Sequence, residues 1–217
     1  MTRVCAKFIP KLLSDQQKNL RLEIAQDNLE MINSDENFLK KIITGDETWV
    51  YGYDPETKQQ SSQWKFPSEP WPKNARQSQT INKEYYVEVL KRLRNAIRRK
   101  RPQLWESGDW LLHHDNAPAH TSNLVQQYLS KHSIAQLRQP PYSPDIAPCD
   151  FWLFPRLKMP LKGHRFDNKQ TVETNATNAL KAISKTDFQE CFNKWKHRYK
   201  QLVQSNGDYF EGCHPPG

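Results

Sequence analysis

Residues 110–120 read WLLHHDNAPAH, a short apolar run that ends abruptly in polar side chains. The apolar part predicts a strand, and Asp115 stands where that strand should end. A helix is predicted next, from Thr121 to about His132, and another short strand follows at 134–137. The order strand, helix, strand indicates parallel strands in an α/β domain.

Toward the N-terminus, the run 42–51, IITGDETWVY, is rich in β-branched and aromatic residues. It predicts a strand with Asp46 in its middle. We expect this strand to lie beside the 110–115 strand in parallel, with the 134–137 strand beyond. Before it, Ser14 and Gln17 have the spacing of a capping box, and apolar residues at helical spacing predict a helix over about 15–33.

Between these strands, the segment 54–79 is polar and contains four prolines, which predicts a long irregular loop. Asn82 then caps a helix predicted over about 83–100. The other elements are expected at 140–148 (turns), 151–154 (an aromatic helix entered at Asp150), 170–183 and 186–204 (amphipathic helices) and 206–207 (a helix end).

Length and composition narrow the class of protein. At 217 residues the chain suits one sizeable domain, and two would be cramped. The net charge of +8 favours a polyanion such as DNA or RNA as partner, although a positive surface is also ordinary. Four scattered cysteines signal neither a zinc module nor a disulfide framework. No 18-residue apolar run or apolar signal core occurs, so an intracellular, non-membrane protein is expected.

The helix predicted over 83–100 has an apolar face and a basic face. The basic face is a candidate contact for DNA phosphates, and the alternative is a merely solvated surface. The run 98–101, RRKR, could also serve as a nuclear-localisation cluster. The cations proposed to bind DNA are Lys91, Arg92, Arg94, Arg98 and Arg99.

Three aspartates stand out by position: Asp46 in a strand, Asp115 at a strand end and Asp150 at the start of a helix. A carboxylate beside a core strand is costly unless it is paired or binds a cation, although any one of them alone could be an ordinary capping or exposed residue. Phosphodiester cleavage gives a reason for all three, because two Mg²⁺ ions held by shared carboxylates stabilise the attacking and leaving oxygens.

Three blocks of the sequence resemble the catalytic blocks of mariner-type DNA transposases: TGDETW at 44–49, HDNAPAH at 114–120 and PYSPDIAPCD at 141–150. The step of 35 from Asp115 to Asp150 is similar to the family's interval between its second and third aspartates. FIPKLL at 8–13 resembles the linker motif before the family's catalytic domain, and DYFEG at 208–212 resembles its ending. Similar domains also occur fused to a histone methyltransferase domain, of which no part is recognised.

The resemblance implies a ribonuclease H-like, retroviral-integrase-like fold, with a mixed sheet flanked by helices. It implies cut-and-paste DNA transposition with Asp46, Asp115 and Asp150 holding two Mg²⁺ or Mn²⁺ ions, in the nucleus. It divides the chain into a linker remnant, 1–14, and a catalytic domain, 15–217, with C-terminal helices at 170–205. It implies a homodimer formed through 8–13 and the loop 54–79.

Two departures from the family are expected to matter. In the family, helix-turn-helix modules that read DNA precede the linker motif, whereas here Met1 lies only a few residues before it. Sequence-specific DNA recognition is therefore expected to be absent or supplied elsewhere. After Gln77 the family would place an apolar hairpin, and this chain goes directly to Ser78. The sheet should therefore lack its second and third strands, which leaves the Asp46 strand as an edge and puts activity in doubt.

Asp145 competes with Asp150 as the third ligand, but it follows Ser-Pro in a turn, where Asp commonly bonds its own backbone. We favour Asp150. Glu47 should point to the opposite face from Asp46 in a regular strand, which predicts a solvent-facing or helix-facing residue.

The remaining polar and aromatic candidates have ordinary interpretations beside functional ones. His113 and His114 could suggest zinc, but without partner spacing we favour hydrogen-bonding roles. Asn116 and His120 are candidates to support the site. Phe151, Trp152 and Phe154 could stack on DNA bases or pack in the core, and both interpretations stay open. For Trp195 and Tyr199 we favour core packing.

Three hypotheses for function follow. The first is a Mg²⁺-dependent DNA endonuclease and strand-transfer domain impaired by its deletion. The second is a DNA-binding or dimerising remnant without catalysis. The third is a product that folds poorly.

Overall fold

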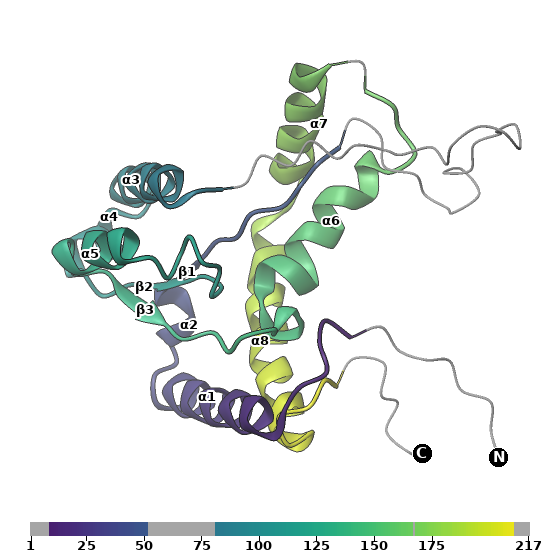
Figure 1. The fold of residues 1–217 in the computed structure, drawn as a ribbon. Coiled ribbons are helices and arrows are strands. Elements are labelled where there is room, and N and C mark those ends of the chain that lie inside the picture. The colour runs from purple at the N-terminus through teal and green to yellow at the C-terminus, as the bar shows by residue number, and fades with distance from the viewer. Residues whose placement is uncertain (1–8, 52–80, 167, 211–217) are drawn as a thin grey trace, which may run out of the picture.

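The structure is a computed structural model that describes residues 9–51, 81–166 and 168–210. Within them, one sheet has the order β1-β2-β3, from β1 (Ile42–Thr44), β2 (Leu111–His113) and β3 (Ala135–Leu137). Both pairings are parallel (Figure 1), which confirms the expected α/β class and the neighbours expected for each strand. The mixed character expected of the sheet is not seen in this part of the chain.

β1 is shorter than the sequence predicts. It ends at Thr44, so Asp46 follows the strand instead of standing in its middle. The last bond between the two strands runs from the Gly45 N–H to the His113 carbonyl at 3.2 Å. Beyond it β2 ends, and within the described residues β1 has no neighbour on its other flank. A β-rich run forms a strand only where another strand can pair with it, and here the partner stops.

Helices begin where the sequence places caps. Ser14 and Gln17 form the expected capping box, and the Asn82 side chain accepts a hydrogen bond from the Tyr85 N–H at 2.8 Å. The helices are α1 (Asp15–Ser34), α2 (Phe38–Lys41), α3 (Lys83–Lys100), α4 (Pro102–Ser107), α5 (Asn123–Lys131), α6 (Phe154–Lys158), α7 (Lys169–Lys181) and α8 (Lys185–Gln204), with short turns η1 (Pro144–Ile146), η2 (Cys149–Leu153, a π-helical turn) and η3 (Met159–Leu161).

Helices cover both faces of the sheet, and each face has its own core. Figure 1 shows α3, α4 and α5 on one side of the strands and α1 on the other. On the first side, Leu90 of α3 and Val125 of α5 pack with Leu112 of β2. On the second side, Ala25 of α1 packs with Trp195 of α8 and with Ile42 of β1, whose own side chain is buried. The sheet is thus held between two helical layers, as expected.

The end of α8 is fastened to α1. Gly207 adopts a left-handed backbone with φ of 81° and donates to the Leu202 carbonyl, which confirms the predicted helix end. A Cβ at this position would lie 2.1 Å from the Lys18 carbonyl oxygen, so only glycine fits. The Gly207 carbonyl in turn accepts a hydrogen bond from the Arg21 side chain. The contacts of Gly207 with Lys18 and Arg21 therefore hold the C-terminal end of α8 against α1.

A groove of about 290 Å³ runs along the outer flank of β1. Ile42, Ile43 and Thr44 line it from the strand, and Leu104 and Phe192 line it from α4 and α8. The groove therefore offers an apolar space beside an edge strand. Gln77 and Ser78, where the hairpin is expected to be deleted, and the loop 54–79 lie outside the described residues. In the described part of the chain, no helix is both long enough and apolar enough to cross a membrane.

Candidate active site

The three candidate aspartates come from three different elements. Asp46 follows the end of β1, Asp115 follows the end of β2, and Asp150 lies in η2. Since β1 and β2 are parallel, their carboxyl ends meet at the same edge of the sheet. The chain after both strands therefore brings Asp46 and Asp115 to one region, and all three residues are half-buried there.

The pKa values show that these carboxylates affect one another. Burial raises the pKa of Asp46 to about 7, and the charges of Asp150, Asp115 and Glu47 add to the rise. Burial and the charge of Asp115 also raise the pKa of Asp150. Negative charge is thus concentrated in a poorly solvated place, where a bound cation would relieve the repulsion.

A test of fit to a divalent metal gives two results. Carboxylate oxygens are the donors that Mg²⁺ prefers, so the three aspartates fit in kind. Yet in residues 9–51, 81–166 and 168–210 no three His, Cys, Asp or Glu side chains form a group that could hold a metal ion. The expected gathering of the three aspartates into one cluster is not seen there. β1 is short, and Asp46 lies beyond the last bond of the sheet.

His120 joins two carboxylates across this region. Its Nδ1 lies 2.6 Å from Asp115 Oδ1, and its Nε2 lies 3.2 Å from Glu47 Oε2. A ring that donates from both nitrogens is protonated. Burial lowers the pKa of His120, but the hydrogen bonds to Asp115 and Glu47 outweigh it and raise the pKa to about 9. The bond from His120 also lowers the pKa of Asp115.

The position of Glu47 differs from the prediction. It was expected to point away from the Asp46 side, as alternate residues do in a strand. Because β1 ends at Thr44, that alternation does not extend to Glu47, whose side chain is 31% exposed and faces His120. Only the tertiary contact identifies this residue as part of the site.

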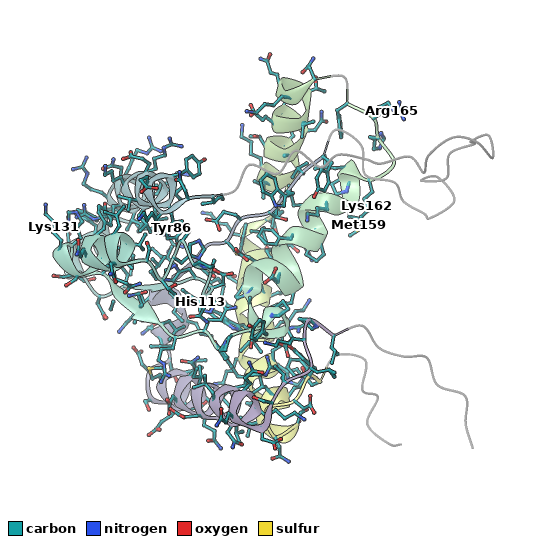
Figure 2. The ribbon with its side chains drawn as sticks, in the orientation of Figure 1. Tyr86, His113, Lys131, Met159, Lys162 and Arg165 are labelled. Atoms are coloured by element: carbon teal, nitrogen blue, oxygen red, sulfur yellow. The ribbon has the colours of Figure 1, made fainter. Side chains whose placement is uncertain are left out.

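Tyr86, at the start of α3, packs against both histidines of the block 114–120. Figure 2 labels Tyr86 on this helix. Its ring centroid is 3.9 Å from that of His120, and its hydroxyl lies 2.7 Å from His114 Nδ1. His114 Nε2 bonds to Gln136 Oε1 at 2.9 Å, so both of its ring nitrogens have partners. His113 Nδ1 bonds to the Thr44 hydroxyl, and burial lowers the pKa of His113 to about 3. These contacts are the hydrogen-bonding roles that we favoured over zinc.

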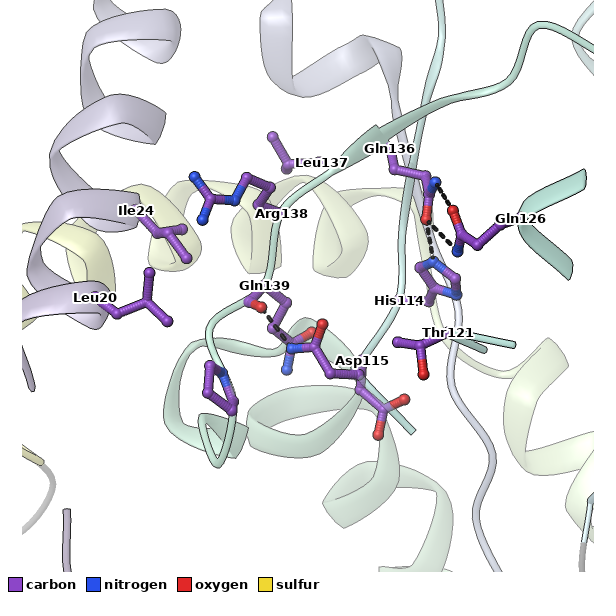
Figure 3. Close-up of a pocket in the computed structure, with 12 residues that line it drawn as sticks. Leu20, Ile24, His114, Asp115, Thr121, Gln126, Gln136, Leu137, Arg138 and Gln139 are labelled. Atoms are coloured by element: carbon purple, nitrogen blue, oxygen red, sulfur yellow. Dashed lines mark hydrogen bonds between the residues drawn. The ribbon is translucent and has the colours of Figure 1, made fainter. Parts of the chain in front are cut away.

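Asn116 braces the loop that carries Asp115. Its side-chain amide donates to the Gln139 carbonyl at 2.6 Å, and both residues line a cleft of about 480 Å³ shown in Figure 3. Leu20 and Ile24 of α1 lie across that cleft. Asn116 thus ties the chain after β2 to the chain after β3.

A second cleft, of about 590 Å³, opens at Asp150. Glu47 lies on its wall, and Lys158 and Lys162 line it from the segment after η2. Figure 2 shows Lys162 beside Met159 on the segment that leads away from the sheet. Lys158 lowers the pKa of Asp150, against the effect of burial. Carboxylates and lysines therefore meet in one open cleft, as a phosphate bound through a metal ion would require.

Comparison with known proteins gives a consistent result. No family model matches the chain. The human histone-lysine N-methyltransferase SETMAR is 30% identical over 94% of this chain, and the Mariner Mos1 transposase of Drosophila mauritiana is 26% identical over 94%. The crystal structure of the Mos1 catalytic domain superposes with a TM-score of 0.77 at 28% identity, covering 94% of this chain and 100% of that one.

The chain is homologous to the catalytic domain of mariner-type transposases. The fold is that of the ribonuclease H-like Mos1 catalytic domain. The Mos1 paired-end complex with Mn gives a TM-score of 0.81 at 26% identity, over 97% of this chain and 68% of that one. The chain spans 33% of the length of SETMAR and 66% of the length of Mos1 transposase.

In this mariner-type domain, Asp145 has a structural partner. Its carboxylate pairs with Arg21 at 2.6 and 3.0 Å, and both side chains are almost fully buried. We expected Asp145 to bond its own backbone, but α1 supplies the partner instead. Of Asp145 and Asp150, it is therefore Asp150 that lines the cleft. Within the described residues, the Asp150 carboxylate forms no hydrogen bond or ion pair.

The basic face of α3 does not line the site. Tyr86 touches His120 near the start of α3, and Arg98 lies twelve residues further, about 18 Å along the axis. Arg92, Arg98 and Arg99 are exposed, whereas Arg94 packs over Trp105. Any DNA contact of this helix is therefore separate from the carboxylates.

The aromatic residues near Asp150 are packed. Trp152 is buried against Phe188, and the Arg198 guanidinium lies over the Phe151 ring. Trp195 and Tyr199 are buried in the core beside α1. Phe154 lines the cleft at Asp150. Packing therefore accounts for this group, except that Phe154 also borders the site.

Sequence reasoning missed Lys158 and Lys162. Their spacing of four residues places two lysines on one side of a helical segment soon after Asp150. That signal was available, but it has meaning only once the turn η2 directs the segment past the carboxylates.

The raised pKa of Asp46 leads to a prediction about stability. The folded pKa of about 7 lies above the ordinary aspartate value of 3.8, so ionisation of Asp46 opposes folding. The cost is absent below about pH 4, grows as pH rises toward 7 and is complete above 7. In EDTA, Asp46→Asn should therefore melt at a higher temperature than the wild type at pH 8 and at the same temperature at pH 4. Equal melting temperatures at pH 8 would contradict the burial of this charge.

Proposed function

We propose that the chain is a Mg²⁺- or Mn²⁺-dependent DNA-cleaving and strand-transfer domain of the mariner type. The observation that carries this proposal is the electrostatic coupling of three half-buried aspartates, one of which, Asp150, lines a cleft together with Lys158 and Lys162, in a domain homologous to Mos1. Structures of Mos1 have been solved with Mn and with Mg, and as paired-end complexes and a strand transfer complex. DNA as substrate implies action in the nucleus.

Each group would have a distinct part in cleavage. Asp46, Asp115 and Asp150 would hold two metal ions, which supply charge stabilisation for in-line attack by water or a 3′-hydroxyl on a phosphodiester. Lys158 and Lys162 would bind the phosphates on either side of the reacting one. Asn116 would keep the Asp115 loop in place through its bond to Gln139.

Plasmid nicking tests the proposal. Supercoiled DNA should be nicked slowly in Mg²⁺ or Mn²⁺ and not in EDTA, and the Asp46→Asn chain should be inactive. The alternative is a DNA-binding or dimerising remnant, which is favoured by the absence of a three-residue metal group in the described part of the chain. Tight DNA binding without metal-dependent nicking would support that alternative. The dimer contacts expected of 54–79 lie outside the described residues.

DNA binding should depend on salt and little on sequence. If Arg92, Arg98 and Arg99 each contact a phosphate, the triple alanine variant should reduce the slope of log K against log salt by about 3. The matched control replaces Lys185, Lys194 and Lys200, which are exposed on α8, and should keep the slope. Fluorescence anisotropy at several salt concentrations measures both. Affinity that does not change with salt would refute phosphate contacts.

Within the described residues β1 has no neighbour on one flank, which predicts the effect of restoring the missing hairpin. An apolar hairpin inserted between Gln77 and Ser78 should pair with β1 and fill the groove lined by Ile42 and Ile43. Both the melting temperature and the rate of Mg²⁺-dependent nicking should rise, and Asp46→Asn in the repaired chain should remain inactive. If the unrepaired chain nicks DNA equally fast, the hairpin is dispensable.

A further inference from the structure

The segment that carries Asp46, after β1, and the segment that carries Asp115, after β2, are not paired as strands of the sheet. The ladder between β1 and β2 covers Ile42 to Thr44, and one more bond follows from Gly45 to His113. In the described residues no backbone hydrogen bond connects 46–51 with 114–120. Something else must set the distance between the two carboxylates.

One side-chain bridge spans the gap. Glu47 comes from the chain after β1 and Asp115 from the chain after β2, and the His120 ring bonds to both, at 3.2 and 2.6 Å. His120 is only 2% exposed, and Tyr86 and His114 pack on its ring. A buried ring enclosed in this way has little freedom to move, so the bridge is stiff.

The bridge reaches both proposed ligands directly. Glu47 is the next residue after Asp46, and its N–H donates to Asp46 Oδ1 at 2.7 Å. Asp115 Oδ1 is held by His120 and by the Ala117 N–H at 3.0 Å. Fixing Glu47 therefore fixes the backbone of Asp46, and fixing Asp115 orients its carboxylate.

We propose that Glu47 is a positioning residue for the metal site. Through His120 it locks the chain after β1 to the chain after β2, and so sets the spacing of Asp46 and Asp115 where the sheet no longer does. The inference rests on the proposed function, because it gives the bridge a metal site to organise. Partners that orient metal ligands typically change metal affinity 10- to 100-fold when they are removed.

Metal affinity tests the inference without requiring nicking. Mn²⁺ is titrated into the full chain, and free Mn²⁺ is followed by electron paramagnetic resonance. Glu47→Gln keeps the shape of the side chain but removes the charge that pairs with His120, and should weaken Mn²⁺ binding about 10- to 100-fold. The matched control, Glu173→Gln, alters an exposed glutamate of α7 that pairs with Lys169, away from the site, and should leave the affinity unchanged. An unchanged affinity in Glu47→Gln would overturn the inference.

A double-mutant cycle separates positioning from a general effect on stability. If Glu47 acts through His120, Glu47→Gln should weaken Mn²⁺ binding little further in a His120→Gln background. Additive losses would show that Glu47 acts by another route and would overturn the inference. Melting temperatures measured alongside identify any variant that has simply lost its fold.

A third measurement distinguishes failure of the inference from failure of the proposed function. Amide NMR signals of Ala117 and His120 should shift in Glu47→Gln, because the bridge connects Glu47 to their loop. If wild-type chain binds no Mn²⁺, the proposed function fails, and the role of Glu47 at a metal site fails with it. If wild type binds Mn²⁺ but neither the loop signals nor the affinity responds to Glu47→Gln, the inference alone fails.

Discussion

Asp150→Asn is expected to reduce Mg²⁺-dependent nicking by about a thousandfold, since losing a metal ligand removes several kcal/mol of transition-state stabilisation. The melting temperature should stay the same or rise. Burial raises the pKa of Asp150, and in the described residues its carboxylate has no hydrogen-bond or ion-pair partner to lose. The uncharged amide therefore removes an unfavourable charge without breaking a contact. Initial rates of plasmid nicking and thermal melts measure the two effects.

Asp145→Asn is the matched control for this variant. It makes the same chemical change five residues away, in a side chain that pairs with Arg21 and not with the cleft. It should lower stability, and at a temperature where the variant is folded it should leave nicking nearly intact. The opposite pattern, with Asp145→Asn inactive and Asp150→Asn active, would assign the third ligand to Asp145.

Arg21→Met should lower the free energy of unfolding by about 3–5 kcal/mol, the cost typical of breaking a buried ion pair by removing one partner. Arg21 is 0% exposed and bonds to Asp145, to the Ser143 hydroxyl and to the Gly207 carbonyl. Its loss leaves the 4%-exposed Asp145 carboxylate without its ion partner, and the Gly207 carbonyl without its bond to Arg21. Urea denaturation at pH 7 measures the change.

A second substitution checks the cause. If the loss comes from an uncompensated buried charge, Arg21→Met with Asp145→Leu should recover part of the stability, because apolar replacements for both partners remove the unpaired charge. Fully additive losses would mean that Arg21 acts through packing and the Gly207 bond alone. The Arg198 side chain, which donates to the Asp145 carbonyl, is kept in every variant.

Local patterns predicted the helices well. The capping box at Ser14 and the cap at Asn82 begin α1 and α3 at the predicted residues. These signals lie within a few residues of the structure they control, so no knowledge of the fold is needed to interpret them. The short helices α2 and α4 were not predicted, because six residues or fewer carry little periodicity.

The strands were predicted in type and order but not in length. The composition of 42–51 favours a strand throughout, yet β1 stops at Thr44 where its partner stops. Strand formation depends on a neighbour that is distant in the sequence, and composition does not report on that neighbour. The same dependence explains why the alternation of a regular strand, from which the orientation of Glu47 was predicted, does not reach Glu47.

The sequence alone determined the family, the α/β class, the parallel neighbours of the 110–115 strand and the three candidate aspartates, because each rests on residue types and spacings along the chain. Only the tertiary structure decided which side chains contact those aspartates and their neighbours. It paired Asp145 with Arg21, set Lys158 beside Asp150, and bridged Glu47 to Asp115 through His120. Ion pairs join residues up to 190 positions apart, as Lys18 and Asp208 show, and the energies that shift a pKa depend on distance in space, which sequence separation does not give.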